Sequence, residues 1–400
     1  MKDFNFKIPQ NIQFGMGSLK KLPEILTESR SDKILLVSDR GLEKIGVVKK
    51  VQDIIETAGL QCTSYLDVVP NPTMAVVNEA ADLYRKCGAT SIVALGGGSS
   101  MDVGKAVGIL ANYGGRITDY EGNHKVPGPI VPMIAIPTTA GTGSEVTASA
   151  VITDTERNYK LSVFSYEILP RYAVLDPELI MTAPASIAAS CGVDALIHAM
   201  EAYVSRNATP FSDAMAEKAM ELIGGSLRRF VANRQDEEAA CAMMLGSNFA
   251  GIAFAWARLG NVHAMSHPVS AYFNVPHGVA NSILLPNVVE YNALADHGRY
   301  EVIYNYIREG SGSTENFTPE LLVEELRRLN RQLGIPATLS EVGVTVEKIP
   351  AMAEDAMKSG NIPANPRQST VRDIIKLYEK TMETGVFSMQ AVLRNDFLTL

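Results

Sequence analysis

The sequence predicts an α/β domain followed by an all-helical domain. Early in the chain, short β-rich segments alternate with segments of helical periodicity; beyond about residue 183 only helical periodicity continues. A chain of 400 residues usually builds more than one hydrophobic core. We therefore expect a doubly wound, mostly parallel sheet with helices on both faces in residues 1–182, and helices alone in residues 183–400.

In the first domain, each compact apolar run is followed by a helical pattern. Strands are expected at 33–39, at 62–69, from Ser91 into a glycine turn, and at 131–137. Helices are expected at 42–60, where Gly59 is a suitable C-cap, from about Thr73, and at 101–115.

The second domain is predicted from apolar stripes at helical spacing with few β-branched runs. The first three such segments are 184–206, 210–234 and 236–259, separated by short Gly-, Pro- or Asn-containing connections. The last residues, 383–400, form an apolar tail for which the pattern predicts no place.

Composition excludes several classes of partner. A content of 46% hydrophobic and 20% charged residues is ordinary for a soluble protein. The net charge of −8 is unfavourable for binding nucleic acid or an anionic membrane. The N-terminal residues "MKDFNFKIPQ" contain no apolar run, so no signal peptide is expected. The apolar runs are shorter than the roughly 18 residues of a membrane span. The cysteines Cys62, Cys87, Cys191 and Cys241 are scattered. We expect reduced thiols and a cytoplasmic protein.

The glycine-rich segment "LGGGSSMDVGKA" (95–106) joins a predicted strand to a predicted helix. Glycines permit close approach of a diphosphate to the backbone, and the following helix N-terminus offers free N–H groups. The segment matches neither G-x-G-x-x-G nor the P-loop pattern. A phosphate loop is our hypothesis, and a purely structural turn is the alternative.

Two further features suit a nucleotide. The loop "PTTAGTGSEVT" (137–147) is rich in hydroxyl groups, and Asp39 closes the first strand, where a carboxylate can accept the 2′-OH of an adenine ribose. However, Asp39 precedes the glycine loop, whereas the acid of the usual fingerprint follows it. A solvated turn residue is the alternative for Asp39, and a simple turn for the loop.

Histidine and aspartate are concentrated in a way that predicts a metal site. Asp194 and His198 are four residues apart, as are His263 and His267, so each pair lies on one helix face. His277, between a proline and a glycine, is expected in a rigid turn or at a helix start. One carboxylate with three imidazoles suits Fe²⁺ or Zn²⁺. Spacing alone does not decide which histidine is left out, and Pro268 must kink or strain its helix.

At these residues the sequence resembles the iron-containing (group III) alcohol dehydrogenases, including members of the 1,3-propanediol, lactaldehyde and methanol dehydrogenase type. The resemblance covers nearly the whole chain, through motifs such as "GGGSSMDVGKA", "IPTTAGTGSEVT", "GVDALIHAMEAY" and "GNVHAMSHPVSAYFNVPHGVANS". It implies a Rossmann-like, dehydroquinate synthase-like N-terminal domain, a helical domain, and a cleft between them. The chain departs from the family pattern only in its tail.

The resemblance also implies roles for matching residues. The metal ligands would be Asp194, His198, His263 and His277, and His267 would lie unligated beside the substrate. The NAD contacts would be Asp39, Asn71, Gly97, Gly98, Ser99, Asp102, Thr138, Thr139, Thr142 and Ser144, with Lys160 near the nicotinamide. Phe254 would face the substrate, whereas Trp256 is expected to pack in the core.

The expected reaction is hydride transfer between a short primary alcohol or diol and NAD, with the alcohol oxygen on the metal (Fe²⁺, with Zn²⁺ possible) and His267 relaying the proton. Asp39 favours NAD over NADP. A homodimer or larger homo-oligomer is expected. The alternatives are glycerol dehydrogenase-like polyol oxidation, a dehydroquinate-synthase-like lyase and a non-catalytic nucleotide- or metal-binding subunit. The lyase should carry more cationic residues near its site than Arg206 and Arg258.

Overall fold

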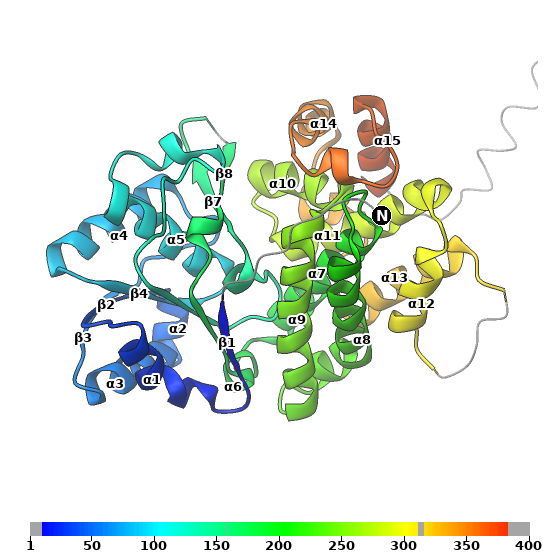
Figure 1. Ribbon diagram of the computed structural model, residues 1–400. Helices are drawn as coiled ribbons and strands as arrows, with labels where there is room; N and C mark the ends of the chain where they lie inside the picture. The colour runs from blue at the N-terminus through cyan, green and yellow to red at the C-terminus, as the bar shows by residue number, and fades with distance from the viewer. Residues whose placement is uncertain (1–9, 158, 311–315, 383–400) are drawn as a thin grey trace, which may run out of the picture.

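The computed structural model describes residues 10–157, 159–310 and 316–382, so the predicted tail lies outside the described residues. Within these ranges all strands precede residue 176, and the chain from α7 (Ala185–Val204) onward is helical. Figure 1 shows the sheet-containing part in blue and cyan beside the helical part in green to red. The predicted fold class is confirmed. Residue 182 falls between α6 (Pro177–Ile180) and α7, and the division into domains at that point stays a prediction.

The centre of the first part is a six-stranded parallel sheet. Its strands, in spatial order, are β1 (Asn11–Phe14), β9 (Tyr172–Leu175), β6 (Met133–Pro137), β4 (Ser91–Gly96), β2 (Lys33–Val37) and β3 (Gln61–Tyr65). At the carboxyl ends of β4 and β6, Gly96 pairs with Pro137. The glycine loop and the hydroxyl-rich loop therefore leave the sheet side by side.

Two-sided burial explains why the strands are apolar throughout. In β4, Ile92 and Ala94 face one core together with α4 (Met74–Cys87) and α5 (Gly98–Tyr113). Val93 and Leu95 face the opposite core with α1 (Leu22–Glu28) and α3 (Val47–Thr57). Helices thus cover both faces, as the alternation predicted.

The single helix predicted over 42–60 is wrong. The chain forms α2 (Arg40–Lys44) and α3, separated at Gly46, whose φ of 80° is left-handed and ends the first helix. The apolar spacing continues across this break because Leu42 of α2 and the apolar face of α3 contact the same core.

A second, small sheet was not predicted. Its order is β5 (Gly122–Asn123), β8 (Tyr159–Phe164) and β7 (Ser149–Asp154), with β7 and β8 antiparallel. The residues of β7 alternate between buried and half-buried positions, so this sheet is covered on one face. It carries Lys160 toward the site described below.

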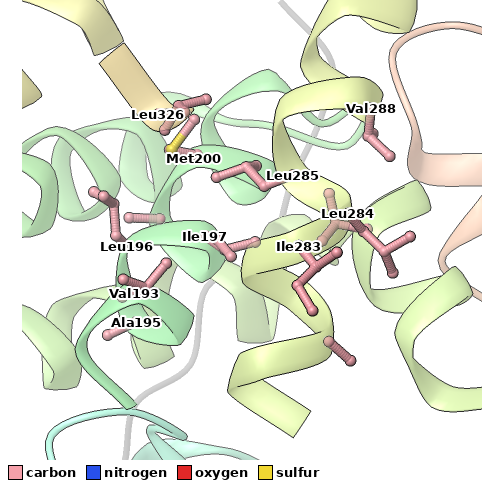
Figure 2. Packing of buried hydrophobic residues seen from close by; sticks show 14 of the residues in the cluster. Val193, Ala195, Leu196, Ile197, Met200, Ile283, Leu284, Leu285, Val288 and Leu326 are labelled. Atoms are coloured by element: carbon pink, nitrogen blue, oxygen red, sulfur yellow. The ribbon is translucent and has the colours of Figure 1, made fainter. Parts of the chain in front are cut away.

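The helical part has one core shared by α7 to α15. Its other helices are α8 (Pro210–Ala232), α9 (Glu237–Ala257), α10 (Asn261–Phe273), α11 (His277–Asn292), α12 (Arg299–Ile307), α13 (Pro319–Gln332), α14 (Ile349–Met357) and α15 (Val371–Met382). Figure 2 shows α7 and α11 packing through Ile197 and Met200 against Ile283 and Leu285.

Helices α7 and α9 are long and apolar enough to cross a membrane by length and composition alone. In this fold, 78% of the most apolar window of α7 and 61% of that of α9 are buried inside the protein. Their apolar surface is therefore largely used in the core. Within that core, α7 also carries a stripe of polar side chains, which marks the candidate site.

Candidate active site

Three predicted ligands form a compact group inside the helical part. One ligand atom from each of Asp194, His263 and His277 lies within 4.8 Å of the others. His198 adjoins this group: its Nε2 is 4.0 Å from Asp194 Oδ1, and its ring stacks on that of His263 with centroids 4.6 Å apart. The structure thus brings all four predicted ligands together, and their role as ligands stays a prediction.

Three helices supply these side chains. Asp194 and His198 lie one turn apart on α7, His263 is in the first turn of α10, and His277 is the first residue of α11. The expected helix start at His277 is therefore confirmed. Helix α10 continues through Pro268 to Phe273.

Each ligand imidazole is held at the nitrogen that points away from the group. The Nδ1 atoms lie 3.2 Å from Gly141 O for His198, 2.6 Å from Glu201 Oε2 for His263, and 3.5 Å from Ser266 Oγ for His277. Such partners fix the ring orientation and leave Nε2 for a cation. The Nε2 atom of His263 is 3.6 Å from Asp194 Oδ1.

Glu201 is a site residue that the sequence reading missed. It is buried on α7, and its second oxygen, Oε1, accepts from the backbone N–H of Val262 at 2.8 Å. A signal was available, because Glu201 follows His198 by three residues and Asp194 by seven, which places all three on one helix face.

Asn281 was missed in the same way. It lies one turn after His277 on α11 and is fully buried. Its Nδ2 atom is 2.6 Å from Asp194 Oδ1, 3.1 Å from His263 Nε2 and 3.2 Å from His277 Nε2.

The buried carboxylates and imidazoles shift one another's pKa values. Burial alone would raise the pKa of Asp194, but His198 and the other histidines hold it below its ordinary value. Burial lowers the pKa of His198 to about 4 and that of His277 to about 3. For His263, burial is outweighed by hydrogen bonds to Asp194 and Glu201, which raise its pKa to about 9. A cation bound at His263 must therefore displace a proton.

The donor set fits a divalent transition metal. Three imidazole nitrogens and one carboxylate oxygen, all buried or half-buried, are borderline ligands of the kind that Fe²⁺ and Zn²⁺ prefer. The anchored Nδ1 atoms supply the outer hydrogen bonds that such sites usually have.

His267 lies beside the group. Its ring stacks on that of His277 with centroids 5.4 Å apart and is 6.5 Å from that of His263. Burial, followed by the charges of His277 and Lys160, lowers its pKa well below the ordinary value. The imidazole is therefore neutral near pH 7 and a weaker base than an exposed histidine. Its proposed relay role stays a prediction.

The two loops at the sheet edge face each other. Thr138 N donates to Gly96 O at 3.0 Å, and a Cβ on Gly98 would lie 3.0 Å from Thr142 Cγ2. Gly97 caps α5, and Ser99 lies in its first turn. A side chain at position 98 would crowd the opposite loop, so the glycine has a structural reason as well as the predicted role in phosphate binding.

A buried lysine that was not predicted ties these loops together. Lys105 Nζ donates to Ser144 O at 2.7 Å, Ser144 Oγ at 2.9 Å and Ser149 O at 2.8 Å. Ser144 Oγ in turn donates to Asp102 Oδ1 at 2.9 Å, and Val151 N donates to Asp102 Oδ2 at 3.1 Å. Both oxygens of Asp102 thus have protein partners, and its contact with a cofactor stays a prediction.

Two predicted cofactor residues from distant parts of the chain are bonded to each other. Lys160 Nζ donates to Asn71 Oδ1 at 2.7 Å, and burial lowers the pKa of Lys160 to about 8. Asp39 has a local role: it caps α2 by accepting from Leu42 N at 3.0 Å. It still lies at the carboxyl end of β2, which neighbours β4 in the sheet.

Aromatic residues border the ligand group. The ring of Phe254 is 4.4 Å from that of His198, between centroids. Its contact with substrate stays a prediction. Trp256 was expected in the core; it is half-buried and stacks on Tyr166 with centroids 5.3 Å apart.

The hydroxyl-rich loop also touches the helical part directly. A Cβ on Gly143 would lie 2.6 Å from Gly251 Cα, so the loop and α9 meet backbone to backbone. Beside this contact, Asn248 Nδ2 donates to Glu145 Oε1 at 3.0 Å. The loop is therefore anchored on the same helical part that holds the ligand group.

Comparisons with known proteins agree with this arrangement. A family model described as iron-containing alcohol dehydrogenase matches residues 9–177, and one described as the C-terminal part of the Fe-containing alcohol dehydrogenase family matches residues 188–382. The NAD-dependent methanol dehydrogenase of Bacillus methanolicus is 39% identical over 379 residues, covering 94% of this chain and 100% of that protein. The lactaldehyde reductase of Escherichia coli K12 is 41% identical over 368 residues, covering 91% and 96%.

A solved 1,3-propanediol oxidoreductase superposes with a TM-score of 0.92 at 36% identity, covering 95% of this chain and 100% of that one. The resemblance predicted from the motifs is thereby confirmed. The chain belongs to the iron-containing alcohol dehydrogenase family.

Proposed function

We propose that this protein is an NAD(H)-linked, iron-dependent alcohol dehydrogenase that interconverts short primary alcohols or diols and their aldehydes, with Zn²⁺ as a possible substitute metal. The observation that carries the proposal is the convergence of Asp194, His263 and His277 within 4.8 Å, with His198 adjoining. When bound, the cation supplies Lewis acidity at the alcohol or carbonyl oxygen, and the nicotinamide supplies or accepts the hydride.

The chain's own groups have distinct tasks in this proposal. Asp194, His198, His263 and His277 hold the cation, and their outer hydrogen bonds set the ring orientations. His267, half-buried and stacked on His277 beside the ligand group, accepts the proton that leaves the alcohol. Phe254 limits the space available for substrate beside His198.

The cofactor is proposed to lie along the carboxyl edge of the sheet. Gly97, Gly98 and Ser99 offer the N–H groups of the α5 N-terminus to the diphosphate. The further contacts are those predicted above: Asn71, Asp102, Thr138, Thr139, Thr142, Ser144 and Lys160, with Asp39 at the adenine ribose. A 2′-phosphate would meet the charge of Asp39, so NAD is favoured over NADP.

The test combines metal content with kinetics. Protein purified without air is analysed for metals, and NADH consumption is followed with short aldehydes, hydroxyaldehydes and glycerol-derived ketones. We expect one metal per chain and the highest rates with short aldehydes; dominant activity on the glycerol-derived ketones would favour the polyol alternative. Full hydride exchange after exhaustive chelation would overturn the proposal.

We also propose a cytoplasmic enzyme that acts as a homodimer or larger homo-oligomer, without nucleic-acid or membrane partners. The net charge of −8 supports the absence of nucleic-acid and membrane partners, and the scattered, free cysteines support a reducing compartment. The oligomer is what the family resemblance implies. Sedimentation of the purified protein tests the assembly, and a monomer at micromolar concentration would contradict it.

A further inference from the structure

The hydroxyl-rich loop (137–147) lies directly on helix α7. A Cβ on Gly141 would lie 2.8 Å from Cys191 Cβ and 3.0 Å from Cys191 O, so the loop backbone and the helix are in contact at this point. Cys191 precedes Asp194 by three residues and His198 by seven, which places all three on one face of α7. The loop therefore crosses the helix on the face that carries two of the predicted ligands.

This contact brings a backbone carbonyl to a ligand imidazole. His198 Nδ1 lies 3.2 Å from Gly141 O, and the side chain is buried. Because a carbonyl oxygen only accepts, Nδ1 must carry the proton, and in the neutral ring the lone pair is then on Nε2. The hydrogen bond and a cation would use different nitrogens of the ring, so they do not compete.

The loop that carries this carbonyl is anchored on both sides. On the sheet side, Lys105 Nζ donates to Ser144 Oγ at 2.9 Å. On the helical side, Gly143 meets the backbone of α9, and Glu145 Oε1 accepts from Asn248 of the same helix at 3.0 Å. The position of the carbonyl over α7 is therefore set by the fold.

We propose that Gly141 is a positioning residue of the metal centre, whose carbonyl orients His198 and fixes the tautomer that presents Nε2 to the cation. The absence of a side chain at this position lets the loop come close enough to α7 for that bond. This inference rests on the proposed function in taking the group as a metal site. It adds that the loop proposed to bind the cofactor also completes the metal centre, although none of its side chains is a ligand.

The variant Gly141→Ala moves the carbonyl without removing it. The backbone of residue 141 is not left-handed, so alanine is opposed there by the contact with α7 and not by its own conformation. To bring the added Cβ from 2.8 Å to an ordinary carbon–carbon distance, the loop must move away from Cys191 by at least about 0.7 Å. Since His198 stands on the same helix, its bond to Gly141 O should lengthen to about 3.6 Å or more, where it is lost.

The matched control is Gly224→Ala, which adds a methyl group at another crowded position of the helical part. Its Cβ would meet the backbone of Tyr306, so it crowds α8 against α12, and neither helix carries a predicted ligand. Both variants and the unaltered protein are stripped of metal, and their thermal unfolding midpoints are measured. Their affinities for Zn²⁺ and Co²⁺ are then measured without nucleotide by competition with a chromophoric chelator, together with the Co²⁺ absorption spectrum.

We expect Gly141→Ala to bind both ions roughly 10-fold more weakly, the low end of the loss that follows removal of a ligand's outer partner, and to alter the Co²⁺ spectrum. Gly224→Ala should unfold at a lower temperature and bind both ions as the unaltered protein does. Equal affinity in all three proteins, or an equal loss in both variants, would overturn the role of Gly141 and leave the metal site intact. Failure of the unaltered protein to bind either ion would overturn the proposed function as well.

A crystal structure of the Zn²⁺-loaded, unaltered protein keeps the test decisive if Gly141→Ala does not fold. We expect Nε2 of His198 to face the ion and Nδ1 to lie within about 3.5 Å of Gly141 O. An Nδ1 atom bound to the ion, or bonded to an acceptor other than Gly141 O, would overturn the inference.

Discussion

Glu201 offers a sharp test of how the metal centre is oriented. Its two oxygens accept from two donors, the N–H of Val262 at 2.8 Å and Nδ1 of His263 at 2.6 Å. Glu201→Gln keeps the shape but leaves only one acceptor. Because a backbone N–H only donates, the amide oxygen must serve Val262, and the NH₂ group then faces His263 Nδ1. In the neutral ring that nitrogen becomes the acceptor, so the one remaining ring proton must lie on Nε2.

The expected magnitude follows from this change of tautomer. A protonated Nε2 has no lone pair for a cation. The site therefore keeps its geometry, but His263 must first give up that proton in order to bind the metal. Loss of such an outer partner usually costs about 10- to 100-fold in metal affinity, or roughly 1.4–2.8 kcal/mol. Removal of one carboxylate should also bring the pKa of His263 down from about 9.

The assay is metal retention during dialysis against graded chelator, followed by elemental analysis. Glu325→Gln is the matched control, because Glu325 is also a buried carboxylate of the helical part but binds Arg228 at 2.6 Å and Arg328 at 2.8 Å. We expect the control to lose stability and keep its metal. Equal retention by Glu201→Gln and the control would refute the reasoning.

Three other outcomes are expected. His267→Ala should keep its metal and lose turnover, whereas His263→Ala should lose both; equal metal loss in the two would contradict the relay assignment. Burial lowers the pKa of Lys105 to about 8, so between about pH 8 and 10.5 the unfolded chain binds the extra proton. The free energy of unfolding of the wild type relative to Lys105→Met should therefore rise with pH over that window, by at most about 1.4 kcal/mol per unit. Urea titrations at several pH values measure this, and a falling difference would be inconsistent with the buried charge. Asp39→Gly should weaken NAD binding and admit NADP, measured as the ratio of kcat/KM values; an unchanged ratio would assign Asp39 only its role as helix cap.

Features that depend on local periodicity were predictable from the sequence. Strands that are apolar on both faces, and the four-residue spacing of Asp194 and His198, can each be recognised within a single strand or helix. Both occur as expected. Gly46 shows the limit of this reasoning, because a hydrophobic stripe can continue across a break between two helices that contact the same core.

Contacts between distant elements were not predictable. Lys105 stands in a helix whose neighbours are apolar, and its partners lie 39 to 44 residues further along the chain. Only the fold shows that a charge there is surrounded by acceptors. The β7–β8 hairpin was missed as well. Ala150 and Ile152 of β7 pack against α4 and α5, a contact between distant elements that is seen only in the fold.

The meeting of Gly143 and Gly251 has a consequence for the distance over which the reaction occurs. A Cβ atom on either residue would lie 2.6–2.9 Å from the opposing Cα. The loop and α9 would therefore have to move apart by roughly 1 Å to reach an ordinary carbon–carbon contact distance. One ångström of misplacement can slow an enzyme about 100-fold when the reacting atoms must approach to about 3–3.5 Å. If the cofactor lies on this loop as proposed, the absence of a side chain at Gly143 and at Gly251 helps to set the distance between the cofactor and the substrate.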